Sequence, residues 1–206
     1  MPRFSRLARH AMYSRQTAIT AAAVICLVTG LVVGAIAAMS RGEAEQAALF
    51  ADLAAHFLSL AHTEQAATVL SMLQHTVGNL LFALIIWLLA FARAAGFLSY
   101  PVVFLQGISY GFTTAILAVS LDLRDVLAAL LVYLPQAVLT ACALLYVCAN
   151  SISYICLTHN GRRHNYGEAA LRRYAKVLAV AVFVALAASA MDIYLAPIAA
   201  RRLNFL

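Results

Sequence analysis

Five apolar stretches, each long enough to cross a lipid bilayer, dominate this chain of 206 residues. A helix needs about 20 apolar residues to cross roughly 30 Å of hydrocarbon. No water is available there, and a helix satisfies its backbone N–H and C=O groups within one segment. We therefore predict an all-α polytopic bundle that forms one integral membrane domain over residues 1–206. Its predicted spans are residues 17–39, 66–91, 96–121, 126–157 and 177–197.

The composition agrees with a membrane protein rather than a soluble one. Hydrophobic residues make up 65% of the chain and charged residues 11%, whereas soluble domains are about 45–50% apolar. Once the spans are removed, no stretch is long enough to bury a core of its own. The cysteines lie in the apolar stretches without a CxxC spacing, so we expect buried small hydrophobic residues rather than disulfides or metal ligands. They are Cys26, Cys142, Cys148 and Cys156.

The basic residues flank the spans and predict the topology. Ten of the fourteen fall in the N-terminal segment, at Arg93 and in the loop 158–176. The positive-inside rule places these segments in the cytoplasm, with the chain in the bacterial inner membrane and its C-terminus outside. The run 17–39 is longer than the apolar core of a signal peptide, so an uncleaved helix is expected. Because the cations form no single basic face, the pattern argues against nucleic acid as a partner.

The sequence also makes a specific structural prediction for two further segments, residues 42–65 and 126–157. Residues 42–65 are acidic with apolar residues at helical spacing, which predicts an amphipathic helix on the outer surface or an extension of the second span. The stretch 126–157 would be too long for one straight crossing at about 1.5 Å per residue. Pro135 lacks an N–H, and we expect it to interrupt this helix.

Small residues mark two places where helices can approach closely. Gly30 and Gly34 lie four apart in the first span, and Gly107 and Gly111 lie four apart in the third. This spacing permits close backbone contact between membrane helices. For Gly30 and Gly34, packing within the chain is favoured over a dimer face.

Several polar side chains fall inside the spans, where they must find partners within the protein. They predict either an interhelical hydrogen-bonded cluster, which is favoured, or a small-molecule or ion site at a broken helix. For Asp192, near a helix end, reaching the interface or pairing with a cation is favoured over proton coupling. The residues are His75, Asn79, Gln106, Ser109, Tyr110, Gln136 and Asp192.

No enzyme constellation is evident, and neither a metal nor another cofactor is expected. His56, His62 and His75 are the candidate metal ligands, but none has a recognisable ligand spacing. His56 and His62 are six residues apart, so they do not share a helix face. A metal site assembled from distant helices stays open as the weaker alternative.

Two motifs resemble those of a known family. Residues 104–113 read Phe-Leu-Gln-Gly-Ile-Ser-Tyr-Gly-Phe-Thr, and a Leu-Pro-Gln follows at 134–136. In this order and spacing the pair resembles the stage II sporulation protein M family. That resemblance implies a non-enzymatic scaffold of the engulfment machinery. Our own hypothesis is that the third and fourth spans form the partner face, with Gln106, Gly107, Gly111, Pro135 and Gln136 in partner or packing contacts.

The resemblance also implies partners. They are a peptidoglycan amidase and a lytic transglycosylase, which the protein would help to localise at the septal membrane. Membrane lipid and further copies of the chain are the other partners this reading allows. Two other classes stay open, namely a permease-like transport component and a protein with an intramembrane metal site.

Overall fold

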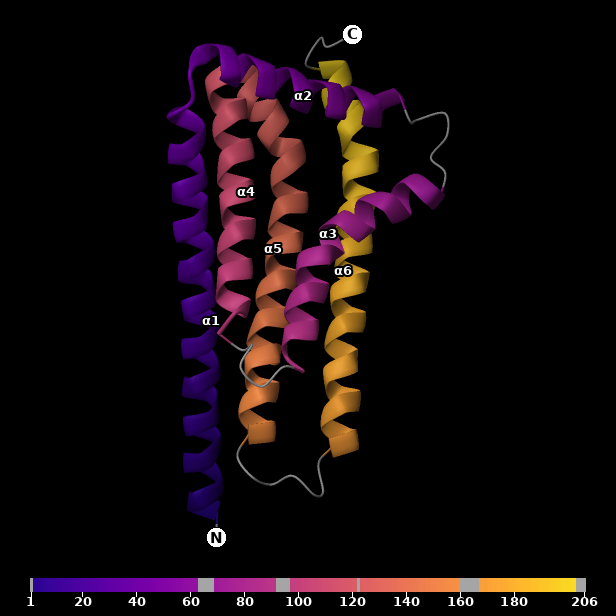
Figure 1. The fold of residues 1–206 in the computed structure, drawn as a ribbon. Coiled ribbons are helices and arrows are strands. Elements are labelled where there is room, and N and C mark those ends of the chain that lie inside the picture. The colour runs from indigo at the N-terminus through magenta and orange to yellow at the C-terminus, as the bar shows by residue number, and fades with distance from the viewer. Residues whose placement is uncertain (1, 63–68, 92–96, 122, 160–166, 203–206) are drawn as a thin grey trace.

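A computed structural model describes residues 2–62, 69–91, 97–121, 123–159 and 167–202, and this part of the chain is helical without a strand. The helices are α1 (Pro2–Met39), α2 (Glu43–His62), α3 (Val69–Leu89), α4 (Ser99–Ser120), α5 (Leu123–His159) and α6 (Gly167–Arg202). Figure 1 shows α1, α4, α5 and α6 standing side by side, with the N-terminus at one end of the bundle and the C-terminus at the other.

Four helices of the described part are long and apolar enough to cross a membrane. These segments are Gln16–Met39, Ser99–Ser120, Tyr133–Cys156 and Leu171–Met191. Each overlaps a predicted span, so the all-α polytopic membrane fold is confirmed.

The remaining predicted span, residues 66–91, corresponds to helix α3. This helix runs from Val69 to Leu89, and among its described side chains the stretch Thr76–Leu89 is apolar. In Figure 1, α3 occupies only part of the height of the bundle.

The predicted interruption at Pro135 is wrong. Helix α5 continues through this residue from Leu123 to His159. One proline removes a single backbone donor, and membrane helices tolerate this where neighbouring helices and side chains compensate. The apolar crossing segment nevertheless starts only at Tyr133, so the excess length lies ahead of the proline.

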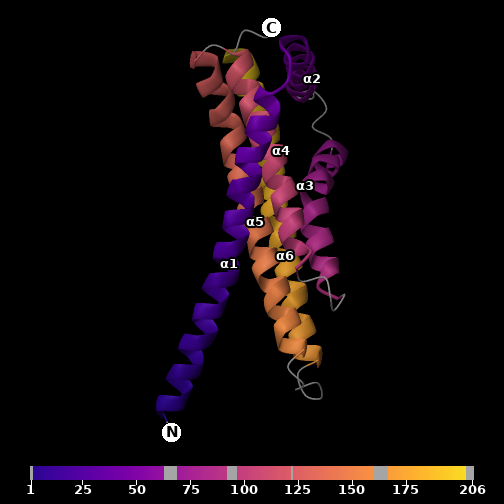
Figure 2. The same ribbon diagram turned by 60° about the vertical axis from the view of Figure 1, so that its left-hand side comes forward.

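Helix α2 lies across one end of the bundle (Figures 1 and 2). Its apolar side chains Leu49, Phe50 and Leu53 pack against a small cluster formed by Ala38, Ala115 and Ile116. The acidic side chains on α2 point to solvent; they are Glu43, Glu45 and Asp52. Residues 43–62 thus form a separate amphipathic helix that lies across the ends of α4 and α6, next to the end of α1.

The main core lies between α3, α5 and α6, with contributions from α1 and α4. Its fully buried members include Ile86, Val103 and Val147. Among the cysteines, Cys148 is buried, while Cys26 and Cys156 are half-buried. Cys142 is exposed, so its expected burial is wrong. It lies on the outward side of α5, where a small apolar thiol can face lipid at little cost.

Candidate functional site

The glycines of α1 and α4 face one another at the closest helix contact of the bundle. A Cβ added to Gly30 would lie 3.1 Å from the Cα of Gly107, and one added to Gly107 would lie 3.2 Å from the Cα of Gly30. A Cβ on Gly34 would lie 2.8 Å from the carbonyl carbon of Ile108. One on Gly111 would lie 2.7 Å from the carbonyl carbon of Leu31. Because these neighbours are backbone atoms, a side chain at any of the four positions would force the helices apart.

This arrangement also decides what the glycine face of α1 contacts. In membranes, small residues let backbones approach so that dispersion forces and weak hydrogen bonds hold the helices together. The partner of Gly30 and Gly34 is α4 of the same chain, so this face is already covered. Figure 2 shows that α1 stays beside α4 along this half and diverges from the bundle toward its N-terminus.

A polar contact joins α4 to α5. The Tyr110 and Thr140 hydroxyl oxygens are 2.6 Å apart, and the Thr140 hydroxyl also lies 2.8 Å from the Gln136 backbone carbonyl. Of the residues predicted to form a polar cluster, Tyr110, the side chain of Gln106 and the backbone of Gln136 are therefore brought together. Ser109 is exposed on the other side of α4 and takes no part in this contact.

Gln106 lies one turn before Tyr110. Its side-chain oxygen is buried and has no hydrogen-bond partner among the described residues, as is also true of the Ser99 hydroxyl. A buried acceptor without a partner costs free energy comparable to a lost hydrogen bond. The Gln106 side chain nevertheless contacts the Tyr110 hydroxyl, so Gln106 extends the polar contact between α4 and α5.

Other predicted residues fall outside the described side chains. They are His56, His62, His75, Asn79 and Asp192. Pro135 and Gln136 are half-buried within α5. Over the described residues, no group of three His, Cys, Asp or Glu side chains could hold a metal ion.

An aromatic cluster of Trp87, Phe91, Tyr154 and Tyr174 joins α3, α5 and α6 and was not predicted. Tyr174 stacks on Trp87 with ring centroids 5.4 Å apart and on Tyr154 at 4.6 Å. Phe91 meets the Trp87 ring edge-on at 4.9 Å. The sequence signal was the position of these residues near the predicted cytoplasmic ends of the spans, where Trp and Tyr are enriched.

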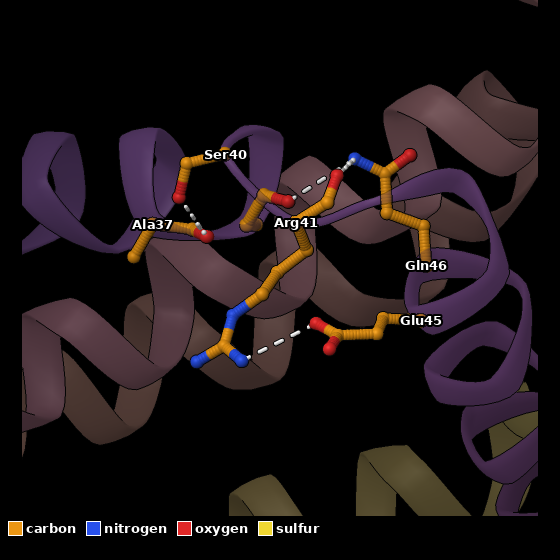
Figure 3. A network of polar contacts seen from close by, with 6 residues as sticks. Ala37, Ser40, Arg41, Glu45 and Gln46 are labelled. Carbon is orange, nitrogen blue, oxygen red and sulfur yellow. Dashed lines mark hydrogen bonds and ion pairs between the residues drawn. The ribbon is translucent and has the colours of Figure 1, made fainter.

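Side-chain hydrogen bonds fix the corner between α1 and α2 (Figure 3). The Gln46 amide donates to the Ala38 carbonyl at 3.2 Å and to the Arg41 carbonyl at 3.0 Å. The Ser40 hydroxyl donates to the Ala37 carbonyl at 2.9 Å. Arg41 and Glu45 form an exposed ion pair at 3.3 Å. Carbonyls at the end of α1 thus find donors, and α2 leaves at a defined angle.

Apolar helices packed on small residues, with polar groups bonded between helices, define a multi-pass α-helical membrane protein. The family model for Stage II sporulation protein M matches residues 23–197, and the chain belongs to this family of sporulation membrane proteins. The match begins within α1 and ends within α6, so it includes α2 to α5 entirely and most of α6. Comparison with curated proteins and with solved structures finds no match.

Proposed function

We propose that this protein is a non-enzymatic scaffold of the sporulation engulfment machinery in the bacterial inner membrane. In this role it recruits peptidoglycan-degrading enzymes, an amidase and a lytic transglycosylase, and holds them at the septal membrane. The observation that carries the proposal is the family match over residues 23–197. A protein that acts in this way needs a rigid bundle and a surface for partners, and the glycine contact between α1 and α4 supplies rigidity.

The surface proposed for partner contact is the outward side of α5. Leu134, Val138, Cys142 and Tyr146 recur every four residues along this helix, and all four are exposed. Residues four apart lie on one face of a helix, so they form a continuous stripe. Such a stripe fits a membrane-spanning helix of a partner protein, because membrane helices associate through van der Waals packing of apolar and small side chains.

Because the partner contact is placed on α5, Gly107 is not expected to contact a partner protein. The glycine face of α4 is occupied by α1, so Gly107 and Gly111 are assigned to packing within the chain. A disruptive change at Gly107 would therefore damage the bundle itself. The outward stripe of α5 offers a cleaner test because its side chains are exposed.

The natural Cys142 provides the probe. In a variant in which Cys26 and Cys156 are replaced by alanine, Cys142 is the exposed thiol, and Cys148 stays buried. A thiol-anchored photo-crosslinker on Cys142 is activated in the native host during spore formation, and adducts are identified by mass spectrometry. We expect wall hydrolases or their membrane anchors among the adducts. The matched control carries the crosslinker at Val32→Cys on α1, with Cys142→Ser, and should lack them.

The same purification also tests the two other classes of protein, a permease-like transport component and a protein with an intramembrane metal site. An ATP-binding subunit recovered in place of hydrolases would favour a permease-like component. A stoichiometric metal in the purified full-length protein would favour the metal-site alternative. Either result, with no hydrolase adduct at Cys142, would overturn the scaffold proposal.

A further inference from the structure

The outward face of α6 combines cations and apolar side chains in one stripe. Arg172, Arg173 and Lys176 are exposed at the start of the crossing segment Leu171–Met191. Val180 and Phe183 continue the same face and are 46% and 73% exposed. With 3.6 residues per turn, positions 172, 176, 180 and 183 fall within about a quarter of the helix circumference.

The opposite face of α6 is the one that packs on the bundle. Tyr174, Val177, Ala181, Ala185 and Ala188 are all at most 5% exposed. The stripe of cations and apolar residues is therefore directed away from the protein, toward the surrounding membrane.

The charges on this stripe are not neutralised by the described part of the protein. The described acidic side chains, Glu43, Glu45 and Asp52, lie on α2, which Figure 1 places at the opposite end of the bundle from the start of α6. Glu168 is the single acid in residues 158–176, against five cations. A net positive charge thus stands at the level where the apolar segment begins.

We infer that this face of α6 binds an anionic phospholipid. Its phosphate contacts Arg172, Arg173 and Lys176, and an acyl chain lies along Val180 and Phe183. The spacing fits, because Phe183 lies seven residues beyond Lys176, which is about 10 Å along a helix at about 1.5 Å per residue. Charge complementarity selects an anionic headgroup, and the apolar continuation selects a lipid over a free phosphate. This inference does not depend on the proposed scaffold role.

The test uses the full-length protein in detergent and native mass spectrometry. The protein is titrated with dioleoyl phosphatidylglycerol, with dioleoyl phosphatidylcholine, and with glycerol phosphate as the free anion. We expect the wild type to bind phosphatidylglycerol more tightly than phosphatidylcholine. The combined variant Arg172→Gln, Arg173→Gln and Lys176→Gln should lose on the order of tenfold to a hundredfold in phosphatidylglycerol affinity, because each cation near a membrane surface contributes to binding. Its phosphatidylcholine affinity should not change.

Two controls accompany this variant. Arg41→Gln removes an exposed cation at the α1–α2 corner and should leave the preference intact. Phe183→Ala should weaken binding of the dioleoyl lipid and leave binding of glycerol phosphate unchanged. A wild type that binds the two lipids equally would overturn the inference, as would a triple variant that keeps the preference. Competition by glycerol phosphate as strong as by the lipid would instead identify a free anion as the occupant.

A second measurement covers the case in which the triple variant does not fold. For the wild type, raising the salt concentration from about 0.05 to about 0.5 M shortens the Debye length and should weaken the preference for phosphatidylglycerol. The variant Arg172→Lys and Arg173→Lys keeps the charges and should retain it. An anionic preference unaffected by salt would contradict the inference.

Discussion

Trp87 and Tyr174 each bind the other's backbone. The Trp87 indole N–H donates to the Tyr174 carbonyl at 3.3 Å, and the Tyr174 hydroxyl donates to the Trp87 carbonyl at 2.9 Å. Since a hydroxyl has one proton, the Ser151 hydroxyl, 2.7 Å away, donates to the Tyr174 oxygen. These bonds attach helix α3 to α6 and α5.

Removing this hydroxyl should loosen α3. Tyr174→Phe keeps the stacked ring but leaves the buried Ser151 hydroxyl and the Trp87 carbonyl without this partner. Interhelical hydrogen bonds in membrane proteins contribute about 0.6 kcal/mol each and at most about 1.7, so we expect destabilisation by about 1–2 kcal/mol. Thermal unfolding in detergent measures it. Tyr146→Phe, at an exposed tyrosine, is the control, and an equal loss there would contradict the assignment.

Gly111→Ala should separate α1 from α4. The added methyl would meet backbone atoms of Leu31, which cannot turn aside as a side chain could. We expect a loss of about 1–3 kcal/mol, as for overpacking in a core. The matched control is Gly78→Ala, because a Cβ at Gly78 meets nothing within 4 Å. That change should be neutral or stabilising by up to about 1 kcal/mol, since alanine favours helix. Equal stability of the two variants would disprove the contact.

The hydrogen bond between Tyr110 and Thr140 should appear as a coupling energy. Tyr110→Phe and Thr140→Val each remove one hydroxyl, and the double variant removes both. Because the two groups are in contact, the losses should not add, and a double-mutant cycle should give a coupling of about 0.6–1.7 kcal/mol. Ser109→Ala, on the exposed side of α4, should show no coupling to Thr140→Val. Additive losses for the first pair would mean that the bond does not contribute.

Gln46→Ala should release α2 from the end of the bundle. The change removes the donor that binds the Ala38 and Arg41 carbonyls. Hydrogen exchange in residues 43–62 should then become faster, while exchange in α4 and α5 should be unchanged, because local opening reports local stability. Arg41→Gln breaks only the exposed ion pair with Glu45, and such pairs contribute little. Unchanged exchange in α2 for Gln46→Ala would show that its apolar contacts alone hold it.

Hydropathy could predict where the chain crosses the membrane but not how the helices are arranged. The pairs Gly30/Gly34 and Gly107/Gly111 indicated close approach, yet a spacing of four residues does not say which helix comes near. The prediction at Pro135 was wrong for a different reason. The local free-energy cost of a proline inside a helix indicated a break, but in a bundle a helix can continue when neighbouring helices compensate for the lost hydrogen bond.

The aromatic cluster and the fate of the polar residues needed the structure for a similar reason. Trp87 and Tyr174 are far apart in sequence, and no local pattern pairs them. Ser109 and Tyr110 are neighbours in sequence, but one faces outward and the other contacts α5, because successive helical residues point about 100° apart. Sequence reasoning therefore identified the polar residues without separating those that bond from those that do not.

The contact between α1 and α4 has a consequence for biogenesis. Helices α2 and α3 separate the two in sequence, so α1 enters the bilayer before its partner has been synthesised. Until α4 has been synthesised, the exposed backbone at Gly30 and Gly34 has no helix of the same chain to pack against. Assembly in the membrane thus includes a late step, in which α1 packs against α4 only after α4 has been synthesised. A nascent chain halted before α4 would expose this strip to any other helix in the translocation machinery.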